Sequence, residues 1–426
     1  MFKSFIQKRL ENYVRRYFKK HPDVKLVAVA GSVGKTSTKT AIATVLSKKL
    51  RVRMLEGNHN THMSAPLGML GIEYPENVHN IFAWLRVFAA ARKRINAPTD
   101  VDVIVQELGT DRPGEIAHFG SYLRPDVGVV TAVTPEHMEF FGSIETVAQE
   151  ELALANFSEL AIINRDDIDG RFADFLTNQN IDTYGTTAAA EFRIEVKDFD
   201  PAHGYEGWLV MSGFAETYPA DIRVIGEHSL RPIIAAVAVA VKLGMGPHDI
   251  VAGVENIVPV PGRMNLLRGI SKSMLIDDTY NSSPASAEAA LQTLYGIQAP
   301  QRIAILGSMN ELGESSAKEH ETLGHLCDPS LLAWVVTIGS EAEKYLAPAA
   351  KARGCQVRSF MSAIDAGAFV RSVLEEEAAV LAKGSQGDIY AEEAIKLLLH
   401  STADDHKLVR QSPRWIATKN AYFSKF

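Results

Sequence analysis

The 426-residue sequence contains few cysteines and no long apolar segment. Cys327 and Cys355 are its two cysteines, and they do not form a C-x-x-C pair. Two thiols supply neither a disulfide framework nor a four-cysteine zinc site, which is typical of a protein in a reducing compartment. No apolar run approaches the roughly 18 residues of a membrane span, and the N-terminus lacks the uninterrupted apolar core of a signal peptide. We therefore expect a cytoplasmic protein.

The sequence also lacks an excess of basic residues. It has 44 lysines and arginines against 51 aspartates and glutamates, a formal net charge of -7 and a pI near 6.0. A dedicated nucleic-acid-binding protein presents a basic surface that neutralises phosphates, so no nucleic-acid partner is expected. With 46% hydrophobic and 22% charged residues, a chain of this length is expected to be globular, with two or three domains.

The first twenty residues depart from this acidic balance. They contain seven lysines and arginines and a single acid, Glu11, while aromatic and aliphatic residues recur at near-helical spacing. The pattern predicts a basic amphipathic helix over residues 1–20. Such a helix either makes peripheral contact with an anionic membrane or packs its apolar stripe on the next domain, and packing is the favoured alternative.

A glycine-containing loop follows a buried strand near the N-terminus. The apolar run from Leu26 to Ala30 predicts the strand, and a helix is expected from Thr38 to Lys48. The loop between them supplies backbone N–H groups to phosphates at a helix N-terminus, with Lys35 reaching the terminal phosphates and Thr36 offering its hydroxyl to magnesium. The residues expected to bind the nucleotide here are Gly31, Ser32, Gly34, Lys35, Thr36 and Ser37.

A series of ordered blocks resembles the Mur ligase family, most closely its D-alanyl-D-alanine-adding branch. The blocks are Gly31 to Thr36, Gly57-Asn58-His59-Asn60 with Ala65-Pro66-Leu67, Glu107-Leu108-Gly109, Arg112 to Ile116, Thr134-Pro135-Glu136-His137, Phe141-Gly142-Ser143, Asn164 to Asp167, Pro261-Gly262-Arg263, Asp277 to Pro284, Gly307 to Gly313 with His320, and Lys383-Gly384-Ser385. They extend over most of the chain, from about residue 24 to residue 400. So many blocks in family order are not expected by chance.

The resemblance implies an α/β protein. A P-loop ATPase central domain with a mostly parallel sheet would span residues 21–258, and a Rossmann-like C-terminal domain would span residues 259–400. A proline-rich junction, Val258 to Gly262, sets this boundary, and residues 401–426 form a polar tail. After the junction, short apolar runs alternate with helix-like stretches, which independently predicts a parallel, doubly wound sheet.

Two residues that follow predicted strands are candidate metal ligands. Glu107 follows the apolar run from Val101 to Val105, at the strand end where ligands of open α/β sheets collect. Magnesium prefers hard oxygen ligands, so Glu107, Thr36 and the ATP phosphates form an expected first site. His137 follows a second apolar run, Val127 to Val133, and resembles a family histidine that binds a second metal.

Three residues beyond the junction are candidate nucleotide contacts. In the family, the arginine after the junction reaches back to the ATP phosphates, which implies that Arg263 couples domain closure to catalysis. Asp278 and Asn281 resemble residues that contact the nucleotide across the cleft, although such Asp and Asn residues are also ordinary turn formers. Lys35, His137 and Arg263 are the predicted catalytic residues.

The chain departs from the family pattern in three ways. Only thirty residues precede Gly31, so no counterpart of the family's N-terminal uridine-nucleotide domain is expected. No lysine lies between Lys93 and Lys197, so the family's carbamoylated lysine is replaced by Glu151, or by Glu150 beside it, as the predicted ligand of a second metal. The block from Gly226 to Ser229 lacks the family's usual asparagines, which leaves base recognition open.

The resemblance implies an ATP- and Mg²⁺-dependent ligase that activates a carboxylate as an acyl phosphate and joins it to an amine. The expected partners are small-molecule carboxylate and amine substrates, with a muramyl peptide and D-Ala-D-Ala as candidates for peptidoglycan precursor synthesis. Ligases that act on a folate, an amino-acid polymer or a cofactor acid share the same ATP-binding domain and stay open as alternatives. A nucleotide-binding homologue that has lost ligation is a further alternative, because the family lysine is replaced.

Overall fold

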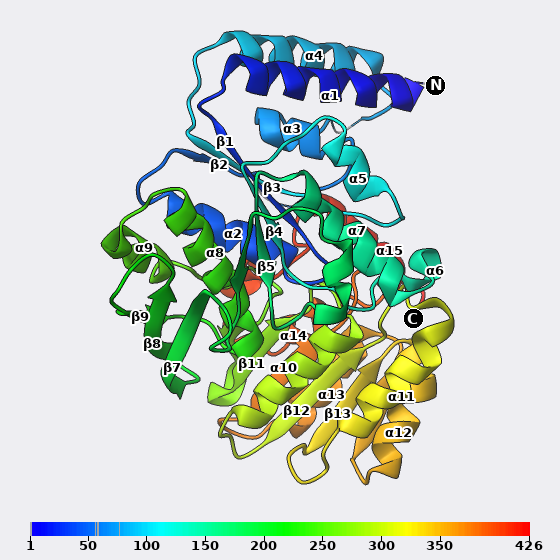
Figure 1. The fold of residues 1–426 in the computed structure, drawn as a ribbon. Helices are drawn as coiled ribbons and strands as arrows, with labels where there is room; N and C mark the ends of the chain where they lie inside the picture. The colour runs from blue at the N-terminus through cyan, green and yellow to red at the C-terminus, as the bar shows by residue number, and fades with distance from the viewer. Residues whose placement is uncertain (1, 56, 58, 76) are drawn as a thin grey trace.

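Two β-sheets follow one another along the chain. A computed structural model describes residues 2–55, 57, 59–75 and 77–426 (Figure 1). Asn58 of the resemblance lies outside the described residues. The first sheet and its helices occupy the N-terminal part of the chain, and the second sheet begins after the proline-rich junction. None of the described helices is long and apolar enough to span a membrane.

The first sheet has nine strands in the order β2-β3-β1-β4-β5-β6-β7-β8-β9. From β2 to β7 neighbouring strands are parallel, whereas β7, β8 and β9 form an antiparallel edge. The order places β1 in the interior of the sheet, and five of its six residues are buried. The strands are β1 (Lys25–Ala30), β2 (Val52–Arg53), β3 (Val103–Glu107), β4 (Val127–Val130), β5 (Leu160–Asn164), β6 (Ile181–Tyr184), β7 (Phe192–Asp200), β8 (Gly204–Met211) and β9 (Tyr218–Ile222).

Helices cover both faces of this sheet. Alternate residues of β1 enter different cores, since Leu26 and Ala28 belong to one and Val27 and Val29 to the other. One core lies under α1 (Phe2–Lys20), α3 (Ala65–Leu70), α4 (Ile81–Asn96), α5 (Glu115–Gly120) and α7 (Ile144–Phe157), with the short α6 (Met138–Phe141) beside α7. The other lies under α2 (Lys35–Leu46), α8 (Leu230–Lys242) and α9 (Pro247–Val254).

The second sheet has six strands in the order β10-β11-β15-β12-β13-β14, all parallel except for the antiparallel β10. The strands are β10 (Asn265–Arg268), β11 (Met274–Asp278), β12 (Arg302–Gly307), β13 (Trp334–Ile338), β14 (Val357–Phe360) and β15 (Ala379–Lys383). The helices are α10 (Pro284–Gly296), α11 (Ser316–Leu326), α12 (Ala347–Ala352), α13 (Ala363–Val373), α14 (Glu392–Lys396) and α15 (Pro413–Phe423). The predicted α/β class with mostly parallel sheets is confirmed.

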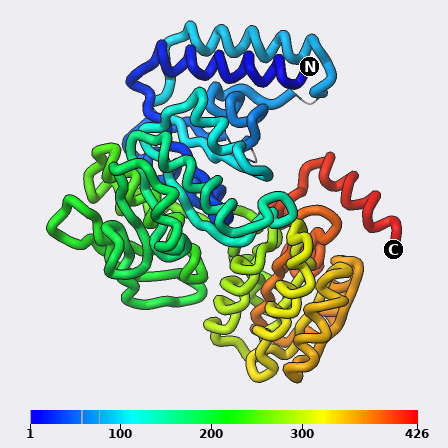
Figure 2. The backbone as a smooth tube through the Cα atoms, turned by 45° about the vertical axis from the view of Figure 1, so that its right-hand side comes forward, coloured from blue at the N-terminus to red at the C-terminus, as the bar shows by residue number. Residues whose placement is uncertain are grey.

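The helix α1 packs on the first sheet's helices rather than standing alone. Its buried residues include Leu10, Val14 and Tyr17, and it contacts α3 and α4. The apolar stripe of this helix is therefore packed against neighbouring helices, which was the favoured alternative to peripheral membrane contact. In both Figure 1 and Figure 2, α1 and α4 form the edge of the molecule farthest from the second sheet.

Element boundaries differ from the predicted ones near the loop. The helix α2 begins at Lys35 rather than Thr38, because Gly34, at φ 84°, already serves as its N-cap residue. The strand β4 ends at Val130 rather than Val133. Thr131 then turns its hydroxyl onto the carbonyl of Val33, at 2.6 Å. The division at residues 20, 258 and 400 stays a prediction.

Candidate functional site

The loop between β1 and α2 lies against the end of β4. Gly31 has φ 128°, and a Cβ on it would lie 2.1 Å from Thr131 Oγ1, so no larger residue fits. The Ser32 hydroxyl accepts from the Thr134 N–H at 3.0 Å. These contacts fix the loop so that the start of α2 faces a cavity, as phosphate binding at a helix N-terminus requires.

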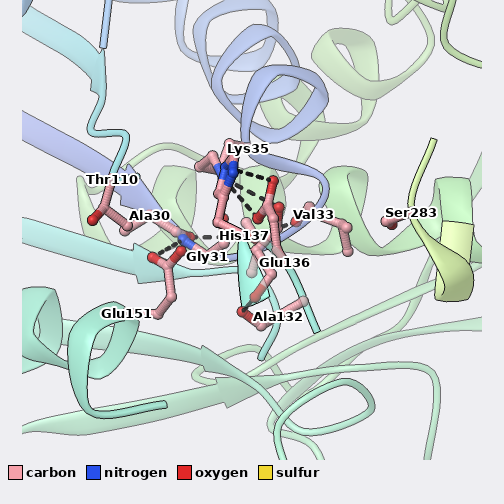
Figure 3. Close-up of polar contacts among 12 residues, drawn as sticks. Ala30, Gly31, Val33, Lys35, Thr110, Ala132, Glu136, His137, Glu151 and Ser283 are labelled. Atoms are coloured by element: carbon pink, nitrogen blue, oxygen red, sulfur yellow. Dashed lines mark hydrogen bonds and ion pairs between the residues drawn. The ribbon is translucent and has the colours of Figure 1, made fainter. Parts of the chain in front are cut away.

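Lys35 lies at the centre of a group of carboxylates. Its ammonium donates to the carbonyls of Gly31 and Ser32 and forms an ion pair with Glu136 at 3.6 Å (Figure 3). Burial lowers the pKa of Lys35, but the carboxylates of Glu136, Glu151 and Glu107 outweigh it and the net pKa is raised. The lysine is therefore fully charged at neutral pH and offers its charge to an anion in the cavity.

The predicted magnesium pair is brought together. The Thr36 hydroxyl donates to Glu107 Oε2 at 3.0 Å, and Asn60 Nδ2 donates to Glu107 Oε1 at 3.2 Å. Glu107 is buried at the end of β3, with the Lys39 ammonium 3.8 Å from its Oε2. Hydroxyl and carboxylate oxygens side by side suit magnesium, so these two residues fit the ion that the sequence predicts.

His137 joins the two parts of the chain. It adopts a left-handed backbone conformation with φ 49°, and its Nδ1 lies 3.0 Å from Glu311 Oε2, in the segment after β12. Its Nε2 is 3.6 Å from Asp111 and from Glu136. Burial lowers the pKa of His137, but the surrounding carboxylates, Glu311 first, reverse the effect and raise it overall.

Glu151 has a partner that the sequence did not suggest. Its Oε2 accepts from the Gly31 N–H at 2.7 Å, beneath the loop (Figure 3). Burial raises the pKa of Glu151 to about 7, against the opposing charge of Lys35. Its neighbour Glu150 accepts from the N–H groups of Gly114 and Ile116 at the start of α5. Among described residues no set of three or more His, Cys, Asp or Glu side chains is placed to hold a metal, so the role of Glu151 as a ligand stays a prediction.

Arg263 faces the loop from the second part of the chain. Its guanidinium lies 4.4 Å from the centroid of the Tyr280 ring, and in the described part of the chain it forms no ion pair. It lines a cavity of about 420 Å³ together with Lys35, Thr36, Glu107, His137 and Asn281. The arginine is therefore free to meet an anion held by the loop.

Asp278 and Asn281 are tied together by a lysine. Lys383, the last residue of β15, forms an ion pair with Asp278 at 2.7 Å and donates to the Asn281 carbonyl at 2.7 Å. Burial lowers the pKa of Lys383, although Asp278 opposes it. Asp278 and Lys383 line a second cavity of about 170 Å³, along with Ser37, His228 and Arg231.

The C-terminal segment fixes the Tyr280 backbone. The buried Arg410 guanidinium donates to the carbonyls of Thr279 and Tyr280, at 2.6 and 3.0 Å. It also forms a bidentate pair with Glu392, at 2.7 and 2.8 Å. Lys419 of α15 adds a further ion pair to the fully buried Glu392, at 3.4 Å. The segment predicted only as a polar tail thus supports the cavity wall.

Sequence reasoning missed four residues that shape the site. Glu136 was quoted in a block but given no role, although it contacts both Lys35 and His137. Lys383 was also quoted without a role, and its position at the end of a buried apolar run was a usable signal. Glu311 was likewise quoted, in the block from Gly307 to Gly313, without a role. Arg410 gave no local signal, because the carbonyls of Thr279 and Tyr280 that it contacts are far away in the sequence.

Two sequence models match this chain. The model of the Mur ligase middle domain matches residues 29–240, and that of the Mur ligase glutamate ligase domain matches residues 262–386. The chain belongs to the Mur ligase family. The family resemblance predicted from the ordered blocks is thereby confirmed, and Mur ligases use ATP.

Curated relatives in the Mur ligase family are longer than this chain. It is 28% identical, over 322 residues, to the UDP-N-acetylmuramoyl-tripeptide--D-alanyl-D-alanine ligase of Bacillus subtilis. The match covers 74% of this chain and 63% of that relative. The chain therefore spans under two thirds of the relative's length.

Solved Mur ligase structures share the fold. A crystal structure of MurF from Acinetobacter baumannii superposes with a TM-score of 0.74 at 23% identity and covers 91% of this chain and 79% of its own. The folylpolyglutamate synthase of Mycobacterium tuberculosis, complexed with ADP and AMPPCP, gives a TM-score of 0.66 at 18% identity. It covers 92% of this chain and 94% of its own. At these identities the likeness is one of fold.

Proposed function

We propose that this Mur ligase family member is an ATP-dependent carboxylate–amine ligase that works through an acyl phosphate. The observation that carries the proposal is a single cavity lined by groups from both parts of the chain. Lys35 and Thr36 of the loop face it from one side, and Arg263 faces it from the other. Two cations around a space that adjoins a helix N-terminus suit a triphosphate.

In this proposal the nucleotide extends over both cavities, with its phosphates in the larger one and its nucleoside in the smaller one. The loop N–H groups and Lys35 hold the phosphates in the larger cavity, where Thr36 and Glu107 supply oxygen ligands to magnesium. The bound ion would neutralise phosphate charge. The smaller cavity, between Ser37 and His228, takes the nucleoside. Burial lowers the pKa of His228 to about 4, so its imidazole is neutral and suited to contact an uncharged base.

The proposed reaction has two displacements. A carboxylate oxygen of the first substrate attacks the γ-phosphorus of ATP, the bond to the bridging oxygen breaks, and ADP leaves. The amine nitrogen of the second substrate then attacks the acyl carbon, phosphate leaves, and the nitrogen loses a proton to give the amide. Lys35 and Arg263 stabilise the negative charge that develops, because both line the larger cavity.

His137 has a positioning role in this proposal. Its link to Glu311 holds the segment after β12 next to the loop segment after β4. Water is excluded from the cavity when the two parts approach, which strengthens each electrostatic contact inside it. The metal role that the resemblance implies for His137 stays part of the proposal.

The relatives' printed activity suggests the substrates. We propose a muramyl tripeptide as the carboxylate and D-Ala-D-Ala as the amine, in peptidoglycan precursor synthesis, by likeness to the Bacillus subtilis relative. The folylpolyglutamate synthase likeness favours a second candidate, a folate with glutamate, because this chain matches nearly the whole of that enzyme.

The test is a screen of both pairs, with other carboxylates and amines, for substrate-dependent release of ADP and phosphate. Mass spectrometry of the products identifies the amide, and the Lys35→Ala variant supplies the blank. We expect one pair to release ADP and phosphate in equal amounts together with the amide. If the protein bound nucleotide but released no phosphate with any pair, the result would instead support the alternative that it is a nucleotide-binding homologue that has lost ligation.

A further inference from the structure

We propose that the paired helices α1 and α4 dock this protein on an anionic membrane surface. The observations concern residues far from the ATP cavity, so the inference does not depend on the ligase chemistry. The two helices lie side by side at the edge of the molecule opposite the second sheet (Figures 1 and 2). Contact there leaves the cavity between the two parts of the chain open.

Exposed apolar side chains gather at one end of this pair. Among the described residues, six of the fifteen exposed large apolar side chains lie here, namely Phe2, Phe5, Val78, Ile81, Phe82 and Leu85. Phe82 is 69% exposed, and Leu85 and Phe5 are each 55% exposed. Single exposed apolar residues scattered over a protein surface are ordinary, whereas a group of them in one place marks an interaction site.

The two helices run parallel, which brings these side chains to one place. The Arg9 guanidinium lies 5.2 Å from the centroid of the Phe88 ring, and Lys20 donates to Asn96 at 3.0 Å. The first contact joins the middles of the two helices and the second joins their carboxyl ends, in the same order along the chain, so the amino-terminal ends of α1 and α4 lie at the same end of the pair. The exposed apolar side chains of the two helices therefore gather at one end of the pair.

The charge along the α1–α4 pair is complementary to an anionic surface. Four basic residues lie in the amino-terminal halves of the helices, beside the cluster, and the others extend toward the carboxyl ends; the four are Lys3, Lys8, Arg9 and Arg86. The two helices hold eleven of the chain's 44 lysines and arginines and one of its 51 acidic residues. That one acid, Glu11, is buried and bonded to His118. A basic surface with protruding aromatic and aliphatic side chains combines insertion into the lipid interface with attraction to anionic headgroups.

The direct test is sedimentation of the full chain with lipid vesicles. We expect binding to vesicles of two parts phosphatidylcholine and one part phosphatidylglycerol, and no binding to phosphatidylcholine alone. Raising the salt concentration should release the protein, because exposed charges are screened. Failure to sediment with the anionic vesicles, or equal binding to both compositions, would overturn the proposal.

A matched pair of variants identifies the surface. Phe82→Glu should weaken vesicle binding by at least about tenfold, because it replaces an inserting side chain by a charge of the lipid's own sign. Ile364→Glu is the control, since Ile364 is also exposed, also the second residue of its helix and also follows a side-chain N-cap. A carboxylate in the first turn suits both helices, so both variants should retain the wild-type melting temperature.

The alternative occupants give distinct outcomes. If a second copy covered the cluster, sedimentation equilibrium would show a dimer that Phe82→Glu dissociates, with no vesicle binding. If Phe82→Glu and Ile364→Glu bound anionic vesicles as tightly as the wild type, the α1–α4 surface would not be the contact. Either result contradicts the proposal.

Discussion

His137 Nδ1 lies 3.0 Å from Glu311 Oε2, although His137 follows a strand of the first sheet, β4, and Glu311 follows a strand of the second sheet, β12. Both adopt left-handed backbone conformations, with φ 49° and 67°. Non-glycine residues rarely adopt such conformations, and they persist where the surrounding structure holds them. The pair is a contact through which the two parts of the chain meet beside the ATP cavity.

This pair predicts a pH-dependent contribution to stability. The folded pKa of His137 is raised, so the contribution is fully present below the ordinary value of 6.5 and is lost as pH rises through the folded pKa. Glu311→Gln should therefore lower the free energy of unfolding near pH 6 and have little effect at pH 9. The loss should stay under about 1 kcal/mol, because Glu311 is more than half exposed.

Urea unfolding at both pH values measures this effect, with Glu314→Gln as the control at an exposed neighbouring position. An equal loss at pH 6 and pH 9 would show that the ion pair is not its source. Nuclear magnetic resonance titration of His137 should also give a lower pKa in the Glu311→Gln variant.

Substitution of Glu151 is expected to change the free energy of unfolding in the opposite direction, as a gain rather than a loss. Its folded pKa is raised to about 7, so its contribution to stability is present below 4.5 and is lost as pH rises through about 7. Glutamine can still accept from Gly31 N–H but carries no charge. Glu151→Gln should therefore gain stability relative to the wild type between pH 5 and pH 8, by on the order of 3 kcal/mol without metal.

The magnesium role of Glu151 is measured in the same variant. If Glu151 is a ligand, Glu151→Gln should raise the magnesium concentration needed for half-maximal turnover and slow turnover several-fold. An unchanged magnesium dependence would leave Glu151 only the structural role seen at Gly31. Activity of the wild type should not respond to bicarbonate, because a carbamoylated lysine is not expected here.

Arg410 predicts that the C-terminal segment supports catalysis from a distance. Arg410→Met leaves the buried Glu392 without its bidentate partner and should lower the free energy of unfolding by about 3 kcal/mol. It should also reduce kcat, because the carbonyls of Thr279 and Tyr280 lose their donor beside Arg263.

Two further variants separate these effects. Arg414→Met removes an exposed arginine of the same segment and should change neither quantity. Adding Glu392→Met to Arg410→Met removes the unpaired charge and should recover part of the stability but not kcat. Full recovery of kcat in the double variant would argue against the positioning role.

The sequence predicted those features that rest on local patterns. The apolar runs that became β1, β11, β12, β13 and β15 were visible because parallel strands are buried on both faces. The loop residues Lys35 and Thr36 were visible because a glycine-containing loop between an apolar strand and a helix is typical of phosphate binding. Fold class and loop chemistry are therefore readable without coordinates.

Features that rest on tertiary contacts were not readable. The antiparallel edge of β7 to β9 shows exposed and buried residues without a continuous apolar run. Glu151 was read as a metal ligand from its place after His137, whereas its contact with Gly31 depends on how α7 packs under the loop. The packing of α4 against α1, and the ion pair between Lys419 of α15 and Glu392, join segments that are far apart in the sequence and gave no local pattern.

Substitution of Lys35 and substitution of Arg263 should affect ATP turnover and ATP binding differently. Lys35→Ala should reduce ATP turnover by at least about a hundredfold without lowering the melting temperature, because Lys35 faces the cavity rather than a core. Arg263→Ala should reduce kcat while the Kd for ATP stays within a few fold. Loss of ATP binding with an unchanged kcat in Arg263→Ala would contradict the proposed contact with the transferring phosphoryl group.

Oxygen transfer from the carboxylate tests the central claim most directly. The substrate pair found by the screen is prepared with ¹⁸O in its reacting carboxylate, and the released phosphate is analysed by mass spectrometry. An acyl phosphate requires that one labelled oxygen leave with each phosphate, alongside unlabelled ADP. Phosphate without label, or label recovered in AMP, would contradict the account.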